Sequence, residues 1–278
     1  MPTDEDTGRE GACRLPVSGM RHGRPFDGHD WVAEEVPVAL EYNGIAQAVM
    51  LATPLDLEDF ALGFSLSEGW IDSRHDLHDF EASRSELGIT LRLEISSRCF
   101  ARLKERRRQL AGRTGCGLCG LETLAQALAP AHGRGHVKGG ASPSIDPAAL
   151  TRAVDRLPPR QPLQKTTGAA HAAAWCSVDG DIVLLREDVG RHNALDKLIG
   201  ARARQEAPAP HGFIAVTSRA SYEMVQKAVC AGAPLLAAVS APTALAVRLA
   251  GQAGLTLAGR VRNGGWMAYS HPGRLAIV

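Results

Sequence analysis

The hydrophobic pattern of the chain changes at about residue 30. Residues 1–28 are rich in glycine, aspartate and arginine and show no apolar period, so we expect a flexible tail there. From Trp31 onward, polar and apolar residues alternate on both sides of Asn43-Gly44, a dipeptide typical of tight hairpin turns. The segment 31–52 is therefore predicted to form a β-hairpin.

A helix and another strand are predicted next. The helix follows Thr53-Pro54, and either Thr53 or Asp56 is a candidate cap. Its apolar residues at helical spacing are Leu57, Phe60, Ala61 and Phe64. Residues 89–96 alternate again, which predicts a strand, and residues 98–108 are strongly basic.

The C-terminal half alternates between strand and helix patterns. Strands are expected on both sides of a turn at Asp179-Gly180, and again in segments 212–218, 234–240 and 255–261. Helices are expected at 147–157, 193–204, 221–232 and 242–251. Strands separated by helices of this length favour a largely parallel α/β sheet.

This pattern predicts an α/β protein in two domains. An N-terminal α+β domain spans residues 29–135 and ends in the CGLCG loop, after the tail of residues 1–28. A larger α/β domain spans 136–278, and a loop-like linker joins the two at 131–145.

Composition excludes several classes of function. The chain has 278 residues, 45% of them hydrophobic and 22% charged, and its net charge is +1. We therefore expect neither nucleic acid nor a membrane as partner. The acidic N-terminus does not resemble a secretory signal, and no apolar stretch has the length of a membrane span. Six unevenly spaced cysteines favour thiol or metal chemistry in the cytoplasm over structural disulfides.

The close pair Cys116-Gly-Leu-Cys119 is the strongest chemical signal. Glycines at 115, 117 and 120 leave both thiols accessible on a deformable loop, and the preceding basic stretch would favour the nucleophilic thiolate. Half of a zinc site, a thioredoxin-like redox pair and a sulfur carrier all fit this spacing. For zinc, His132 and His136 are the available further ligands.

A second group of polar residues lies in the α/β half. Asp188, Arg191, His192 and Asn193 cluster between a strand and a helix, where open α/β sheets bind ligands. The alternative is an ordinary helix start with a solvated face. Arg219 and Ser221 occupy a similar position and suit a phosphate, although Ser221 could simply cap its helix.

Two further segments carry candidate chemistry. His171 resembles the first element of a zinc nucleobase deaminase, but Ala173 replaces the glutamate that deamination needs. Segment 259–274 combines arginines, glycines, Trp266 and Tyr269, which suit phosphates and a stacked base. The chain has no P-loop motif, so we expect no nucleotide hydrolysis.

From about Asp30 to the C-terminus, the sequence resembles the formate dehydrogenase accessory protein family, FdhD. The motifs that carry the resemblance are CGLCG, TTGAAHAAA, REDVGRHNALDKLIG, TSRASYEMVQKA, AVSAPTALAV and G-x-x-R-x(6)-Y-S-H-P-x-R. Departures from the family pattern are Ala169 and Ala170 before the histidine, Arg260 in place of an aromatic, and Gly265 in place of a basic residue.

The resemblance implies a cytoplasmic homodimer whose C-terminal domain is similar to the cytidine deaminase fold. It implies a sulfurtransferase that takes sulfur from a cysteine desulfurase and passes it to the bis-molybdopterin guanine dinucleotide form of the molybdenum cofactor, as formate dehydrogenase requires. Cys116 corresponds to the persulfide cysteine and Cys119 to its companion.

The cofactor is expected to bind as a substrate, which a guanine nucleotide could mimic. The family's cofactor segment corresponds to Arg260, Val261, Arg262, Asn263, Gly264 and Gly265. The further expected contacts are Arg219, Ser221, His171, Asp188, Arg191 and His192. We expect no bound metal. A cofactor chaperone without a covalent step and a zinc-stabilised binding protein are the alternatives.

Overall fold

The computed structural model describes residues 9–111, 144–206 and 211–276. The CGLCG loop, His132 and His136 lie outside these ranges, and so do most of the expected linker and the predicted boundary at residue 135. Within the described ranges, no helix is long and apolar enough to cross a lipid bilayer.

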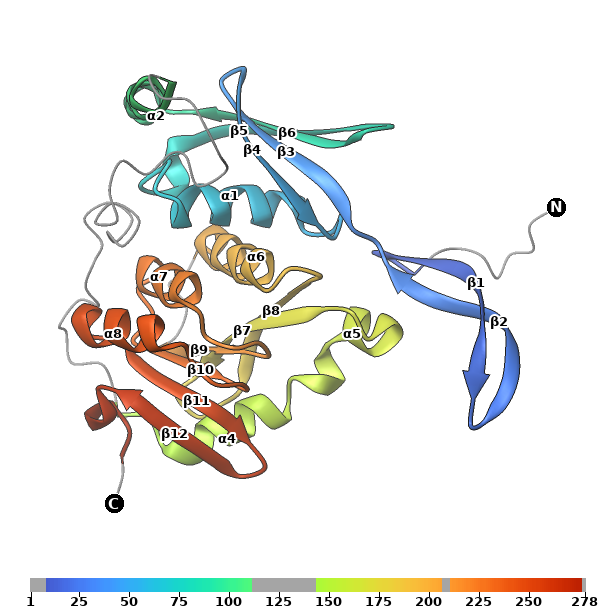
Figure 1. Ribbon diagram of the computed structural model, residues 1–278. Coiled ribbons are helices and arrows are strands. Elements are labelled where there is room, and N and C mark those ends of the chain that lie inside the picture. Colours follow the sequence, from blue (N-terminus) through green and yellow to red (C-terminus); the bar gives the residue numbers. More distant parts are fainter. Residues whose placement is uncertain (1–8, 112–143, 207–210, 277–278) are drawn as a thin grey trace.

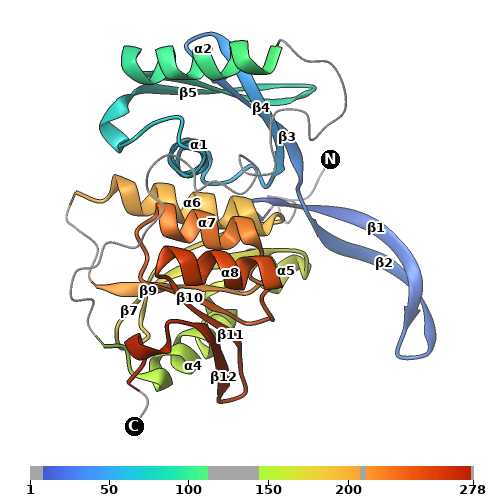
Figure 2. The same ribbon diagram turned by 60° about the vertical axis from the view of Figure 1, so that its left-hand side comes forward.

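The predicted tail is wrong for residues 12–28, which belong to a two-stranded hairpin of residues 12–33. Strands β1 (Ala12–Arg21) and β2 (Arg24–Ala33) pair antiparallel around a turn at His22-Gly23, where both residues have positive φ. The hairpin projects from the body of the protein (Figures 1 and 2). Both of its faces are largely open to solvent, so polar residues and glycines interrupt the alternation by which a half-buried strand is identified.

A four-stranded sheet with order β4-β3-β6-β5 follows. Its strands are β3 (Val36–Tyr42), β4 (Ile45–Ala52), β5 (Leu77–Ser85) and β6 (Gly88–Ile95). The predicted hairpin at Asn43-Gly44 and the predicted strand at 89–96 are confirmed as β3–β4 and β6. Helices α1 (Leu57–Ser67) and α2 (Ser97–Ala111) accompany this sheet, with a 3₁₀ turn at Arg74–Asp76.

The C-terminal half forms a six-stranded sheet with order β12-β11-β10-β9-β7-β8. Its strands are β7 (His171–Ser177), β8 (Ile182–Asp188), β9 (Gly212–Val216), β10 (Leu235–Ala238), β11 (Thr256–Arg262) and β12 (Gly265–Ser270). Only β9, β10 and β11 are parallel, so the prediction of a largely parallel sheet is wrong. The tight β7–β8 and β11–β12 turns leave no room for the crossover that parallel pairing needs.

Helices cover both faces of the larger sheet. The layer formed by α6 (Arg191–Arg204), α7 (Tyr222–Cys230) and α8 (Ala244–Ala253) lies on one face, and α4 (Pro147–Asp155) lies on the other (Figures 1 and 2). Short helical pieces occupy Pro158–Arg160, Pro162–Thr167 (α5) and Pro272–Arg274. An apolar cluster fills each face of the sheet.

The two sheets are joined through α1, which packs directly on α6 (Figure 1). Glycines make this close approach possible. A Cβ atom added to Gly63 would lie 1.7 Å from the backbone oxygen of Asp196, and one added to Gly200 would lie 1.9 Å from that of Asp59. Neither position can therefore accept a side chain unless the two helices move apart.

Buried charges reinforce the same contact. Nζ of Lys227, on α7, lies 2.9 Å from Oδ1 of Asp196 on α6 and 3.0 Å from Oε1 of Glu68, which follows α1. Ser67 donates a hydrogen bond to the same Asp196 oxygen over 2.6 Å. Burial acts to lower the pKa of Lys227, but the two carboxylates outweigh it and raise the pKa overall.

A second buried network of hydrogen bonds and an ion pair connects the loop before α1 to β8. Nζ of Lys197 lies 2.7 Å from Oδ2 of Asp188 and donates to the backbone oxygen of Thr53 over 3.0 Å. The Thr53 backbone N–H donates to Asp188, and its hydroxyl accepts from the N–H of Val189. Neither candidate cap holds α1 by its side chain: the Thr53 hydroxyl bonds Val189, and Asp56 lies at the N-cap without a capping bond.

We expect Gly200→Ala to lower the free energy of unfolding by about 2–3 kcal/mol, because the added methyl group forces α1 away from α6. Urea denaturation measures the change. Gly251→Ala in α8 is the matched control, since a Cβ atom there meets no atom within 4 Å, and helix propensity should raise stability by up to about 1 kcal/mol. Equal midpoints for wild type and Gly200→Ala would contradict the proposed close contact.

Lys197→Met should cost about 3–5 kcal/mol of unfolding free energy, because it leaves the buried Asp188 carboxylate without its cation. Adding Asp188→Asn to this variant removes the uncompensated charge and should recover part of the loss. The midpoints of chemical denaturation for the two variants give the comparison. Additive losses in the double variant would show that the two side chains do not interact.

Candidate functional site

One edge of the larger sheet gathers most of the predicted polar residues. The parallel strands β9, β10 and β11 all end there, β7 begins there at His171, and β8 ends there at Asp188. Backbone hydrogen bonds tie the loops together: Thr217 N–H donates to Ala172, Ser240 N–H to Ser218, and Arg260 N–H to Ser240. This strand-end site is where open α/β sheets bind their ligands.

Three helices point their N-termini toward this site. Helices α6, α7 and α8 each follow a strand that ends at this edge. Thr243 caps α8 by accepting from Ala246 N–H, but Ser221 at the N-cap of α7 makes no capping hydrogen bond. The capping alternative for Ser221 is therefore wrong, and its hydroxyl is available for other contacts. Exposed N–H groups and aligned helix dipoles make such an edge attractive to anions.

Arginines add positive charge without local compensation. No carboxylate among the described residues forms an ion pair with the arginines of the strand-end site, which are Arg191, Arg219, Arg260 and Arg262. Elsewhere in the described chain, arginines such as Arg186 and Arg204 pair with acids. The Nε atom of Arg191 is buried without a hydrogen-bond partner. An anionic ligand would supply the missing partners.

His192 contacts the start of α7 through Glu223 in the first turn and Ser221 at the N-cap. Its Nε2 atom is 2.7 Å from Oε2 of Glu223 and 3.4 Å from Oγ of Ser221. Burial lowers the pKa of His192, and the Glu223 carboxylate opposes this shift. Burial and the nearby Arg191 also lower the pKa of His171. The imidazoles are thereby biased toward the neutral form, which can both donate and accept a hydrogen bond.

The sequence analysis did not identify Glu223 as a site residue. A glutamate in the first turn of a helix is common on any surface, because it complements the helix dipole. Its role follows only from the tertiary contact with His192, which lies 31 positions earlier in the chain.

Two of the predicted contact residues have interior side chains. Asp188 is fully buried and its oxygens bind Lys197, Asn193 and backbone N–H groups. Asp188 therefore supports the site only through the residues that it binds, and its expected part in cofactor binding stays a prediction. Val261 is also fully buried, in the apolar cluster beneath the sheet, so only its backbone could reach a ligand.

The predicted cofactor segment forms the end of the β11–β12 hairpin. Arg262, Asn263, Gly264 and Gly265 are all exposed there. Arg260 and Asn263 adopt positive φ values of 55° and 53°, a backbone conformation that non-glycine residues seldom adopt and that recurs at ligand sites. Burial of Val261 between two exposed arginines follows from the alternation of a strand.

A possible metal-ligand group among the described residues lies elsewhere, at Asp72, Asp76 and Cys99. Arg98 and Arg102 form ion pairs with these carboxylates. Hydrogen bonds from Ser96 and from backbone N–H groups lower the pKa of Asp76 to about 2, against the effect of burial. The guanidinium groups already occupy the place of a cation.

The expected chemical residues Cys116 and Cys119 fall outside the described ranges. Of the other cysteines, Cys176 is buried, and burial raises its pKa to about 12. Cys230 is half-buried.

Known proteins resemble the chain along most of its length. The model of the FdhD/NarQ family matches residues 33–276, starting at the last residue of β2. The "Sulfur carrier protein FdhD" of Variovorax paradoxus (strain S110) is 59% identical over 264 residues, covering 94% of this chain and 92% of that protein. The protein of the same name from Cupriavidus necator is 58% identical over 260 residues, covering 93% and 88%.

A solved structure supports the fold. A crystal structure described as that of a formate dehydrogenase accessory protein from Desulfotalea psychrophila matches with a TM-score of 0.70 at 22% identity. The match covers 95% of this chain and 99% of that one. From the family match and the close relatives together, we conclude that this chain belongs to the FdhD/NarQ family.

Proposed function

We propose that the protein is a sulfur carrier for formate dehydrogenase. It takes sulfur from a cysteine desulfurase, as a persulfide on Cys116, and delivers it to the bis-molybdopterin guanine dinucleotide form of the molybdenum cofactor. The names of its close relatives support sulfur carriage, and the C-x-x-C pair supplies the thiols. The observation that carries cofactor binding is the strand-end site, where three helix N-termini meet arginines without carboxylate partners.

The transfer begins with thiolate exchange. The Cys116 thiolate attacks the outer sulfur of the desulfurase persulfide, and the S–S bond there breaks as the desulfurase cysteine leaves as a thiolate. Cys116 then carries the persulfide. In the second step, the Cys119 thiolate attacks the inner sulfur, and hydrosulfide leaves toward the molybdenum centre. Formation of the Cys116–Cys119 disulfide provides the two electrons that reduce the sulfane sulfur to hydrosulfide, and cellular thiols then reduce the disulfide back to the two cysteines.

The dinucleotide end of the substrate binds at the strand-end site in this proposal. Arg219 and Arg262 form charge-assisted hydrogen bonds with its phosphates, and the exposed turn of Asn263 and Gly264 lets the backbone approach the nucleotide. Ser221 and His192 offer a hydroxyl and an imidazole beside the phosphates. Arg191 closes the site between His171 and His192.

The remaining expectations extend the proposal. We place the protein in the cytoplasm as a homodimer, and we assign the larger sheet and its helices to a cytidine deaminase-like domain without deaminase chemistry. A cofactor chaperone without a covalent step is the second candidate, because the strand-end site could hold the dinucleotide without any thiol.

Intact-mass measurement tests the covalent step. After incubation with desulfurase and cysteine, wild type should gain the mass of about one sulfur atom, and a thiol reductant should remove it. Cys116→Ala should gain none, whereas Cys119→Ala and the control Cys13→Ala should still gain it. If the double variant Cys116→Ala/Cys119→Ala still activates formate dehydrogenase, the sulfur carrier is ruled out in favour of the chaperone.

Nucleotide binding tests the strand-end site. Arg219→Ala and Arg262→Ala should each weaken GDP binding by roughly tenfold or more, because each removes a charge-assisted hydrogen bond of about 1.5–3 kcal/mol. Isothermal titration calorimetry measures the affinities. Arg248→Ala, an exposed arginine within α8, should leave GDP affinity unchanged. Equal affinities in all four proteins would place the nucleotide elsewhere.

A further inference from the structure

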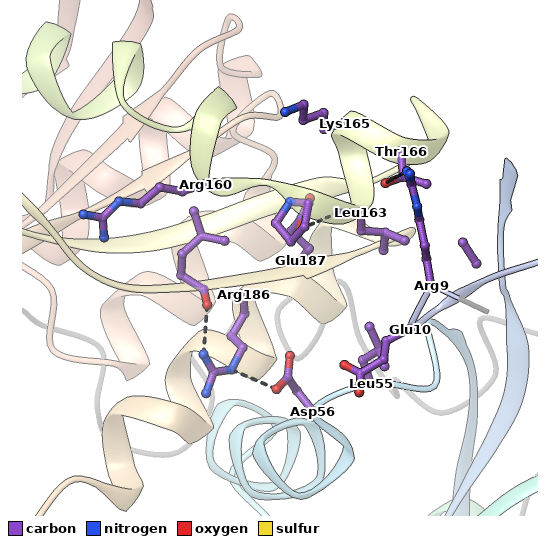
Figure 3. Close-up of a pocket in the computed structure, with 13 residues that line it drawn as sticks. Arg9, Glu10, Leu55, Asp56, Arg160, Leu163, Lys165, Thr166, Arg186 and Glu187 are labelled. Atoms are coloured by element: carbon purple, nitrogen blue, oxygen red, sulfur yellow. Dashed lines mark hydrogen bonds and ion pairs between the residues drawn. The ribbon is translucent and has the colours of Figure 1, made fainter. Parts of the chain in front are cut away.

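A cavity of about 860 Å³ opens beside the foot of the β1–β2 hairpin, away from the strand-end site. Its walls come from the segment before β1, the loop before α1, α5 and strand β8 (Figure 3). None of the predicted cofactor contacts lines it. A cavity of this size can hold a small ligand or several side chains of a peptide.

Part of the charge in this cavity is already neutralised. Arg186 forms an ion pair with Asp56 at 3.4 Å (Figure 3) and another with Asp59 at 2.7 Å. Glu187 accepts hydrogen bonds from the backbone N–H groups of Leu163 and Gln164, both over 2.9 Å. The Arg186 ion pairs and the Glu187 hydrogen bonds hold α1 and α5 against β8. The partners of Glu187 are uncharged N–H groups, so among the described residues no cation pairs with this carboxylate.

Three exposed cations remain. Arg9 donates to the hydroxyl of Thr166, and Arg160 donates to the backbone oxygen of Ile182, so neither has a carboxylate partner in the described chain. Lys165 extends from α5 without a polar contact among those residues (Figure 3). The lining acids that form no ion pair in the described chain are Glu10, which is exposed, and Glu187, which is buried. The mouth of the cavity is therefore positively charged.

Apart from Glu187, the buried part of the cavity lining is apolar. Leu163 is 5% exposed, Ala12 is 6% exposed, and Leu55 and Leu185 are half-buried beside them. An apolar floor beneath a cationic rim suits a ligand that carries a hydrophobic group next to an anionic one.

The hairpin beside the cavity has strand edges that are not paired in the described chain. Its foot contacts α5, but the outer edge of each strand has no strand partner in the described chain. Leu15, Val32 and Met20 are 45%, 40% and 68% exposed. A two-stranded hairpin is marginally stable in water by itself, and a third strand on its edge would stabilise it.

We propose that the cavity and the hairpin together bind an extended acidic segment of a partner protein. Acidic side chains of that segment contact Arg9, Arg160 and Lys165, an adjacent apolar side chain enters the cavity, and its backbone pairs with an edge of the hairpin. Charge complementarity and the unpaired strand edges favour a peptide over a free small anion, which would use the cavity alone.

Fluorescence anisotropy with the full-length protein tests this proposal. The probe is a labelled peptide in which glutamate alternates with leucine and valine, and its twin carries glutamine at every glutamate. The glutamate peptide should bind, and the glutamine twin should bind at least tenfold more weakly. Arg160→Glu/Lys165→Glu should weaken binding of the glutamate peptide at least tenfold, and Leu15→Ser on the hairpin should weaken it severalfold. The charge-matched control Arg248→Glu should bind like wild type.

Three outcomes would overturn the proposal. They are equal binding of both peptides, unchanged binding by Arg160→Glu/Lys165→Glu, and complete competition by free glutamate at the concentration of the peptide, which would identify a small-anion pocket. GDP affinity of the charge-reversal variant should equal that of wild type, because no residue of the strand-end site is changed. Failure of this inference is thereby distinguishable from failure of the proposed sulfur transfer.

Discussion

The backbone contact between α1 and α6 is the constraint on which the rest of the structure depends. Gly63 and Gly200 let the two helices approach until any side chain between them would collide with backbone. This proximity places Asp59 and Asp196 in the interior, where each requires a cation. Arg186 and Lys227 supply that charge from neighbouring elements. The two halves of the chain therefore pack directly against each other at this interface.

The same contact determines how the strand-end site is built. Helix α6 carries Arg191 and His192 at its start, and α7 carries Glu223 one turn before Lys227. Holding α6 and α7 against α1 therefore also holds the His192–Glu223 pair in place. These contacts pair the internal acids with cations, whereas the arginines at the strand ends form no ion pair with a carboxylate of the described residues. The division of charge between interior and edge makes the edge a site for anions.

The exposed strand edges in the two parts of the protein differ in whether side chains bond their backbone. Along β8, the guanidinium groups of Arg160 and Arg186 donate hydrogen bonds to the backbone oxygens of Ile182 and Leu185. Such contacts prevent another chain from pairing with the edge. No guanidinium group among the described residues bonds the backbone oxygens of the β1–β2 hairpin in this way, and the hairpin shows apolar side chains to solvent. This contrast distinguishes an edge that is closed to partners from one that is open to them.

Local sequence determined most elements, because hairpin dipeptides, apolar runs and helical spacing act within a few residues. It also identified the motifs of the family and the strand ends that carry them. It could not show that β12 pairs antiparallel with β11, that Asp188 turns inward to Lys197, or that Glu223 meets His192. Those outcomes depend on residues far apart in the chain. Only the packed structure decides which charged side chains are buried against a partner and which stay hydrated, since burial is a property of the whole fold.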